Sequence, residues 1–429
     1  VLRERIDELE TIVLRIANIV AKIDGVICPE EAERLKWIHC ELQRCLVAIP
    51  VESDEKSNAR SPGQAELRLD PAFDDAFFEG EGGQSSDKSA VDGPLDPAAR
   101  KKELDAGLAE LEGLIGLDCI KHDVKELTNF LKVQAERVRR GLPQTKVSLH
   151  MIFSGNPGTG KTTVARLLGR ILSGLGVLAR GHLIETDRSG LVAHYAGQTS
   201  SKTHKKIDEA LDGVLFIDEA YSLVAEQGDD AYGNEAVQAL LKRIEDDRER
   251  LVVILAGYPE SMDRLLDANP GLASRFGRRL DFPDYRVPEL GGIFLAMCEA
   301  NDYTLPAATR LRLIAGFQHL LDRRDEKFGN GRLARNVFET AIRRLANRIA
   351  DVAPLTADLL TTIEPADILL PDVPDQVYRG LDDPHLRLSS VCPGCHEKVR
   401  CQSGLLGRRV KCKQCQHDFR LDWGDLETS

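Results

Sequence analysis

The most constraining feature of this sequence is a glycine-rich stretch at 155–162 that fits the phosphate-binding pattern G-x-x-x-x-G-K-[ST]. An apolar segment at 147–153 predicts a buried strand before it, and residues 163–172 predict a helix after it. In such a loop, backbone N–H groups and the helix N-terminus surround phosphate, and glycine permits the close approach. Lys161 is expected to neutralise the β- and γ-phosphates, and Thr162 to place its hydroxyl on Mg²⁺. The residues expected to bind nucleotide here are Gly155, Asn156, Pro157, Gly158, Thr159, Gly160, Lys161, Thr162 and Thr163.

A second element supports the same chemistry. The apolar run at 213–217 ends in two carboxylates, Asp218 and Glu219. Such a strand holds its terminal residues at the carboxyl edge of an open α/β sheet, where ligands bind. We expect Asp218 to bind Mg²⁺ and Glu219 to orient or deprotonate the attacking water. A buried strand that runs into an acidic turn is the alternative interpretation, and the neighbouring phosphate loop makes it the weaker one.

The 429 residues are too many for one domain of usual size. Between 52 and 100 the sequence holds twelve Asp/Glu against five Lys/Arg with few branched apolar residues, which predicts a disordered acidic linker. Strand-like and helical stretches then alternate, which predicts an α/β fold with a parallel sheet and crossover helices. The predicted parts are an all-α domain at 1–50, the linker at 51–104, an α/β subdomain at 105–288, a helical lid at 289–370, a linker at 371–388 and a cysteine-containing module at 389–422.

Several separated motifs, taken in order, resemble those of the AAA+ P-loop ATPases, and specifically the branch of red-type Rubisco activases and stage V sporulation protein K-like ATPases. The resemblance covers about residues 105–345 and rests on 113–117 with Lys121, 156–163, 195–199, 213–221, 255–258 and 269–276. It implies a large α/β subdomain, a small helical lid and a homo-hexameric ring. ATP would lie between the two subdomains, with Ile115 and Gly116 near its adenine.

The same resemblance gives roles to single residues. Arg275 falls where the family places an arginine finger, which enters the neighbouring subunit's site and can be worth about 10³–10⁵ in rate. Arg332 matches the second sensor arginine of the lid, with Arg335 as the alternative. Tyr195 falls in the loop whose aromatic residue grips polypeptide in a central pore. Tyr258 departs from the family pattern, because many members have a water-positioning asparagine there. When the resemblance is set aside, the alternative interpretation of Arg275 is a solvent-exposed arginine at the end of a helix. The alternative interpretation of Tyr195 is a side chain that packs in a turn.

Two C-x-x-C pairs close the chain, Cys392 with Cys395 and, after sixteen residues, Cys412 with Cys415. Paired turns of this spacing predict a four-thiolate Zn²⁺ site in a zinc ribbon. Since four thiolates leave no open coordination position, the zinc is expected to be structural. Residues 391–420 hold seven Lys/Arg and two Asp/Glu, so the ribbon resembles those that bind nucleic acid or protein, and the sequence leaves that choice open.

Residues 1–50 show apolar residues at three- and four-residue spacing, which predicts helices. They resemble tellurite-resistance B-like domains through 16–27 and 29–35. Metal binding by Asp24 and the pair Glu30 and Glu31 is an alternative, but helix capping and an acidic first helical turn explain these residues better.

The net charge of −12 does not favour a general attraction to nucleic acid or to anionic lipid. The apolar runs, such as 251–256, are far shorter than the ~20 residues that a membrane-spanning helix needs. We therefore expect no membrane partner and a cytoplasmic location.

These observations lead to one preferred function and two alternatives. The preferred function is ATP-dependent remodelling of protein clients, a chaperone activity like that of Rubisco activases, with ATP, Mg²⁺ and Zn²⁺ as cofactors. The first alternative is a nucleic-acid-dependent ATPase recruited through the basic ribbon. The second is a nucleotide-switched scaffold with negligible turnover. The identity of the client is not determined by the sequence.

Overall fold

The computed structural model describes residues 97–426 apart from 144, 146, 194–196, 225–229, 326–327, 382 and 384–385. These residues fall into two compact units, 97–383 and 386–426. The predicted helical domain at 1–50 and most of the predicted linker at 51–104 lie outside the described residues.

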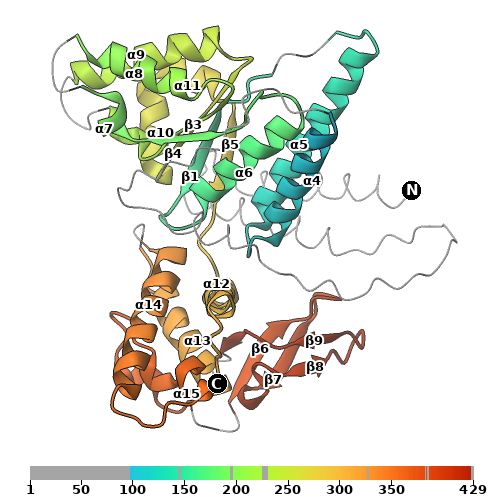
Figure 1. Cartoon of the computed structure of the whole chain (residues 1–429), viewed down its shortest axis with the longest axis vertical. Helices are drawn as coiled ribbons and strands as arrows, with labels where there is room; N and C mark the ends of the chain where they lie inside the picture. Colours follow the sequence, from blue (N-terminus) through green and yellow to red (C-terminus); the bar gives the residue numbers. More distant parts are fainter. Residues whose placement is uncertain are drawn as a thin grey trace, which may run out of the picture. The chain divides into compact units, whose positions relative to one another are not determined.

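A five-stranded parallel sheet forms the centre of the first unit (Figure 1). Its strand order is β2-β3-β4-β1-β5, so β4 lies between β3 and β1. The two continuously apolar strands β3 and β4 are buried along their whole length, as expected when helices cover both faces of a parallel sheet. The predicted α/β fold is confirmed. The strands are β1 Met151–Gly155, β2 Leu183–Thr186, β3 Gly213–Ile217, β4 Leu251–Gly257 and β5 Arg278–Phe282.

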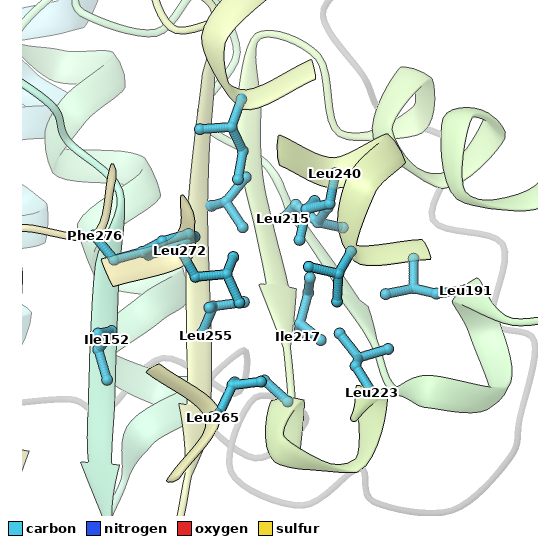
Figure 2. Close-up of a cluster of buried hydrophobic side chains, with 14 of the residues drawn as sticks. Ile152, Leu191, Leu215, Ile217, Leu223, Leu240, Leu255, Leu265, Leu272 and Phe276 are labelled. Carbon is cyan, nitrogen blue, oxygen red and sulfur yellow. The ribbon is translucent and has the colours of Figure 1, made fainter. Parts of the chain in front are cut away.

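Helices cover the two faces of this sheet. On one face, Leu215 and Leu255 pack into an apolar cluster with side chains of α8, α9 and α10, including Leu240 (Figure 2). On the other face, Gly169 of α6 lies so close to Val214 that an added Cβ would come within 3.2 Å of it. The helices of this subdomain are α4 Pro97–Gly113, α5 Asp118–Arg139, α6 Lys161–Gly174, α7 Arg188–Leu191, α8 Thr199–Glu209, α9 Ala231–Asp246, α10 Pro259–Ala268 and α11 Pro270–Arg275.

Helix α4 corrects one predicted boundary. It begins at Pro97, inside the stretch predicted as linker up to residue 104. The composition of 51–104 gave no sign of it, because its stability comes from packing. Leu104 and Leu111 are buried, and the backbone of Leu104 lies against Gly174 of α6. Tertiary burial of an apolar stripe, more than intrinsic propensity, stabilises most protein helices.

The helical lid follows β5. It comprises α12 Val287–Ala300, α13 Ala307–Leu321, α14 Asn330–Ile349 and α15 Ala357–Thr361. The chain continues through two 3₁₀ turns, Pro365–Asp367 and Asp375–Tyr378, and the Arg312 guanidinium lies 3.8 Å from the centre of the Tyr378 ring. The packed lid therefore extends to Tyr378, past the predicted boundary at 370.

The second unit is a small β module. Strands β6 Arg387–Val391 and β7 Lys398–Gln402 pair antiparallel, and β10 Asp425–Leu426 joins β6. A separate hairpin pairs β8 Arg409–Lys411 with β9 Asp418–Arg420. Because β10 lies beyond residue 422, the module extends past its predicted end. In the part of the chain that the structure describes, no helix is long and apolar enough to span a bilayer.

Candidate nucleotide-binding and zinc sites

The phosphate loop connects β1 to α6. Gly158 and Gly160 have φ values of +70° and +90°, which side chains other than glycine rarely adopt. The Lys161 ammonium donates hydrogen bonds to the carbonyl oxygens of Gly155 and Asn156, both at 2.8 Å. Thr162 follows in the first turn of α6. The loop thus presents an ammonium, a hydroxyl and a helix N-terminus at one edge of the sheet, which is a suitable arrangement for phosphate.

The electrostatic environment of the Lys161 ammonium favours the binding of an anion. Burial lowers the pKa of its ammonium to about 8, the carboxylate of Asp218 raises it, and the charge of Arg332 lowers it further. A buried cation without a full counter-charge is costly, and phosphate oxygens would supply that charge.

This pKa predicts a pH-dependent affinity for nucleotide. Phosphate binding favours the protonated amine, so the pKa of Lys161 rises in the complex and affinity falls as pH rises above the free-state value of about 8. The Kd for a fluorescent ADP analogue should increase roughly eightfold between about pH 7.5 and about pH 9. The Lys161→Arg protein, whose guanidinium does not titrate in this range, should show a flat profile. An equally flat profile for the wild type would contradict the lowered pKa.

The two carboxylates follow β3 at the same edge. Asp218 donates its backbone N–H to the Thr186 carbonyl oxygen at 2.8 Å, and its own Oδ1 accepts the Glu219 N–H at 3.0 Å. Asp218 is half-buried, whereas Glu219 is exposed and has a φ of +47°. Because β4 lies between β3 and β1, the carboxylates and the phosphate loop stand two strand positions apart, roughly 10 Å, at the same edge of the sheet.

Two further side chains line this edge. Tyr258 follows β4, its ring centre lies 5.8 Å from that of Tyr221, and burial and the negative charges of Glu219 and Asp218 raise the pKa of its hydroxyl. Glu185 of β2, which the sequence did not single out, has its pKa raised by partial desolvation and by Asp218. The sequence signal for Glu185 is a polar residue near the carboxyl end of a strand.

Arg332 lies near the N-terminus of α14. A Cβ added to Gly158 of the phosphate loop would come 2.9 Å from the Arg332 nitrogen and 3.2 Å from its Cγ, and the charge of Arg332 lowers the pKa values of Lys161, Glu185 and Tyr258. Arg335, one turn later, instead forms an ion pair with Glu339 of the same helix at 2.9 Å. Of the two predicted sensor arginines, Arg332 lies beside the phosphate loop, and its sensor role stays a prediction.

The predicted adenine segment lies beside the phosphate loop. Ile115 is packed against α12, where a Cβ added to Gly292 would come 3.4 Å from its Cγ2. A Cβ added to Gly160 would come 3.4 Å from the Leu117 side chain. Gly116 has a φ of +64° and lies against Glu289 of α12. The segment thus bridges the phosphate loop and the lid, as expected for a base-binding wall.

Arg275 lies at the opposite edge of the sheet. Register pairs Met151 with Arg278 and Gly155 with Phe282, so the end of α11 is near the start of β1 and the phosphate loop follows its end. Four steps of strand separate the two edges by roughly 13 Å. The Arg275 guanidinium donates to the Gly271 carbonyl oxygen at 3.2 Å and lies 3.7 Å from the Glu245 carboxylate. It therefore does not belong to its own subunit's phosphate site.

Tyr195 lies outside the described residues. The base of its loop is held together on both sides, because Ala193 donates its N–H to the Thr199 hydroxyl at 3.2 Å. The Lys202 ammonium donates to the carbonyl oxygens of Ser189 and Val192 at 2.5 and 3.0 Å. Lys202 thus stabilises the loop base.

The four predicted zinc ligands form a cluster, with their sulfur atoms all within 4.8 Å of one another. The Sγ–Sγ distances are 3.6 Å between Cys392 and Cys415 and 3.7 Å between Cys395 and Cys412. A tetrahedral ion with Zn–S bonds of about 2.3 Å requires thiolates about 3.8 Å apart. The donor set therefore fits Zn²⁺, and the cluster does not include Cys401, the cysteine treated as a bystander.

Zinc content should distinguish ligand from bystander. The wild type and Cys401→Ser are expected to carry about one zinc per chain, and Cys412→Ser none, because three thiolates lose most of the affinity. Elemental analysis of the purified proteins measures this. Limited proteolysis should cleave residues 386–426 only in Cys412→Ser, since so small a module depends on the metal for its fold. Zinc retained by Cys412→Ser would contradict the four-thiolate assignment.

Comparison with known proteins agrees with this geometry. The model of the ATPase family associated with various cellular activities (AAA) matches residues 151–284, and that of an AAA lid domain matches 286–376. Stage V sporulation protein K of Bacillus subtilis is 42% identical over 260 residues, which are 60% of this chain and 80% of that protein. The plasmid-encoded protein CbxX of Cupriavidus necator is 43% identical over 267 residues, 61% of this chain and 83% of that protein.

The ESX-1 secretion system protein EccA1 of Mycolicibacterium smegmatis is 43% identical over 284 residues, and the match spans only 50% of its length. This chain belongs to the AAA ATPase family, and it is an ATPase. The family resemblance and the parallel-sheet fold with its lid, both expected from the sequence, are confirmed.

Proposed function

We propose that this protein forms a homo-hexameric ring that uses ATP hydrolysis to remodel polypeptide clients. The observation that carries the proposal is the position of Arg275, at the sheet edge opposite its own phosphate loop. A finger arginine in that position acts only on the nucleotide of a neighbouring copy. Hydrolysis would then depend on assembly, and each hydrolysis event would involve residues of two subunits.

Within one site, the positions of the residues support a role for each. Lys161 and the loop N–H groups bind the phosphates, and Thr162 and Asp218 hold Mg²⁺, which neutralises charge on the transferring phosphoryl group. Glu219, exposed at the end of β3, orients the attacking water and accepts its proton. Arg332 approaches the phosphates from the lid. The Ile115–Gly116 backbone forms a wall for the adenine.

The client is proposed to be a polypeptide gripped by Tyr195. The test is a Glu219→Gln trap, which should bind ATP without turnover and hold its client. After nuclease treatment of the native lysate, we expect one dominant protein to copurify with Glu219→Gln and to be lost from Glu219→Gln/Tyr195→Ala. Phe in place of Tyr195 is the matched control, because it keeps the aromatic ring. A client retained equally by the Ala variant would contradict the pore-loop role.

A second candidate function rests on the ribbon. Its Lys and Arg side chains, including Arg400, Arg409 and Lys411, are exposed on β7 and β8. Copurifying material that consists only of nucleic-acid-binding proteins and disappears with nuclease would favour the nucleic-acid-dependent ATPase. Unchanged hydrolysis in Glu219→Gln would instead favour the nucleotide-switched scaffold.

A further inference from the structure

A buried asparagine joins the lid to the phosphate loop. Asn330, the first residue of α14, is fully buried and has a φ of +47°. Its carboxamide NH₂ donates to Asp284 Oδ1 at 2.7 Å, to the Phe328 carbonyl oxygen at 3.0 Å and to the Pro157 carbonyl oxygen at 3.3 Å. Its carboxamide oxygen accepts the Tyr285 N–H at 2.8 Å. One side chain thus binds the phosphate loop, the β5–α12 connection and its own helix start.

The phosphate loop reaches the same acceptor from the other side. The Asn156 carboxamide donates to Asp284 Oδ1 at 2.9 Å, so both asparagines converge on one carboxylate oxygen. Asp284 is further balanced by the Arg324 guanidinium at 3.4 Å. Hydrogen bonds to a charged acceptor are the stronger kind.

The backbones of the two segments also touch. The Gly331 N–H donates to the Gly158 carbonyl oxygen at 3.0 Å. A Cβ on Gly158 would come 2.4 Å from the Gly329 carbonyl oxygen and 2.9 Å from the Arg332 nitrogen. The phosphate-binding pattern leaves position 158 free, yet here the lid backbone requires glycine. The start of α14 therefore packs directly against the phosphate loop.

We propose that Asn330 is a positioning residue for hydrolysis, whose carboxamide fixes the start of α14 to the phosphate loop and so holds Arg332 over the phosphates. The inference rests on the proposed role of Arg332, which lies two residues further along the helix. Asn330 does not touch nucleotide. Its contribution to hydrolysis should consequently pass through Arg332.

The experiment is a double-mutant cycle between the two residues. Asn330→Gly removes the carboxamide and keeps a residue that adopts positive φ without strain. In full-length protein, Asn330→Gly and Arg332→Ala should each lower kcat about tenfold, with the Kd for ADP changed less than about threefold. The double variant should be no slower than Arg332→Ala alone. Asn301→Gly is the matched control. In the described part of the chain, the Asn301 carboxamide donates to the Met297 carbonyl oxygen of α12 and makes no other hydrogen bond, so the kcat of this variant should stay at the wild-type value.

Each other outcome has a definite meaning. A wild-type kcat in Asn330→Gly would overturn the inference, because Asn330 would then have no role in hydrolysis. A further tenfold loss when Asn330→Gly is added to Arg332→Ala would also overturn it, because Asn330 would then act independently of Arg332. A loss of ADP affinity that parallels the loss of kcat would also overturn it, because Asn330 would then only shape the phosphate loop. Thermal unfolding of each variant separates these results from a loss of fold. Absence of hydrolysis in the wild type would contradict the proposed function itself. A wild-type rate in Arg332→Ala would contradict the role of Arg332 and would overturn the inference with it.

Discussion

The Arg275→Ala protein is expected to hydrolyse ATP about a thousandfold more slowly than the wild type while binding it equally well. The physical reason is that the guanidinium stabilises charge that develops only in the transition state, and finger arginines are worth about 10³–10⁵ in rate. Steady-state kcat and the Kd for an ATP analogue measure the two effects. The Kd should be unchanged because a guanidinium that stabilises only transition-state charge adds nothing to the binding of ground-state ATP.

Mixed rings provide the sharper form of this test. Lys161→Ala removes nucleotide binding from a subunit but leaves its finger intact, and Arg275→Ala does the reverse. When the two inactive proteins are mixed, each Arg275→Ala subunit that follows a Lys161→Ala neighbour has a complete site, so activity should reappear. Lys161→Ala/Arg275→Ala mixed with Arg275→Ala is the control and should remain inactive. Inactive mixtures in both cases, with subunit exchange verified, would place the catalytic arginine elsewhere.

The Glu219→Gln protein is expected to lose at least a hundredfold in kcat with ATP affinity retained. The amide preserves the shape of the side chain but cannot accept the proton of the attacking water, and general-base groups contribute about 10²–10⁴ in rate. Glu219 is exposed and contacts Asp218 only through its backbone N–H, so the substitution should leave the fold intact. Single-turnover hydrolysis with bound ATP isolates this step.

The matched control is Glu185→Gln. Glu185 is a carboxylate of the neighbouring strand β2, and the negative charge of Asp218 raises its pKa. It removes a negative charge from the same edge without removing the proposed base. We expect it to lower kcat by less than about tenfold. Equal losses in both variants would mean that net charge at this edge, more than a general base, controls hydrolysis.

Segments whose chemistry is local were predictable from the sequence. The phosphate loop, the Asp218–Glu219 pair and the four cysteines each lie in short stretches with fixed spacing, because their ligands demand it. The central strands β3 and β4 were predictable because two-sided burial makes them continuously apolar, whereas the edge strands β2 and β5 carry charged residues. The roles of Arg275, Arg332 and Tyr195 came only with the family resemblance, and they remain predictions.

What the sequence by itself determined is therefore the class of the fold, the phosphate-binding chemistry and the thiolate site. The tertiary structure alone decided which distant residues meet. Asn156 and Asp284 are 128 positions apart, and Pro157 and Asn330 are 173 apart, so no periodicity or spacing links them. Helix α4 is a similar case, because its stability depends on packing against α6. A local sequence pattern predicts the structure and chemistry of one segment, whereas a contact between distant segments depends on how the whole chain packs.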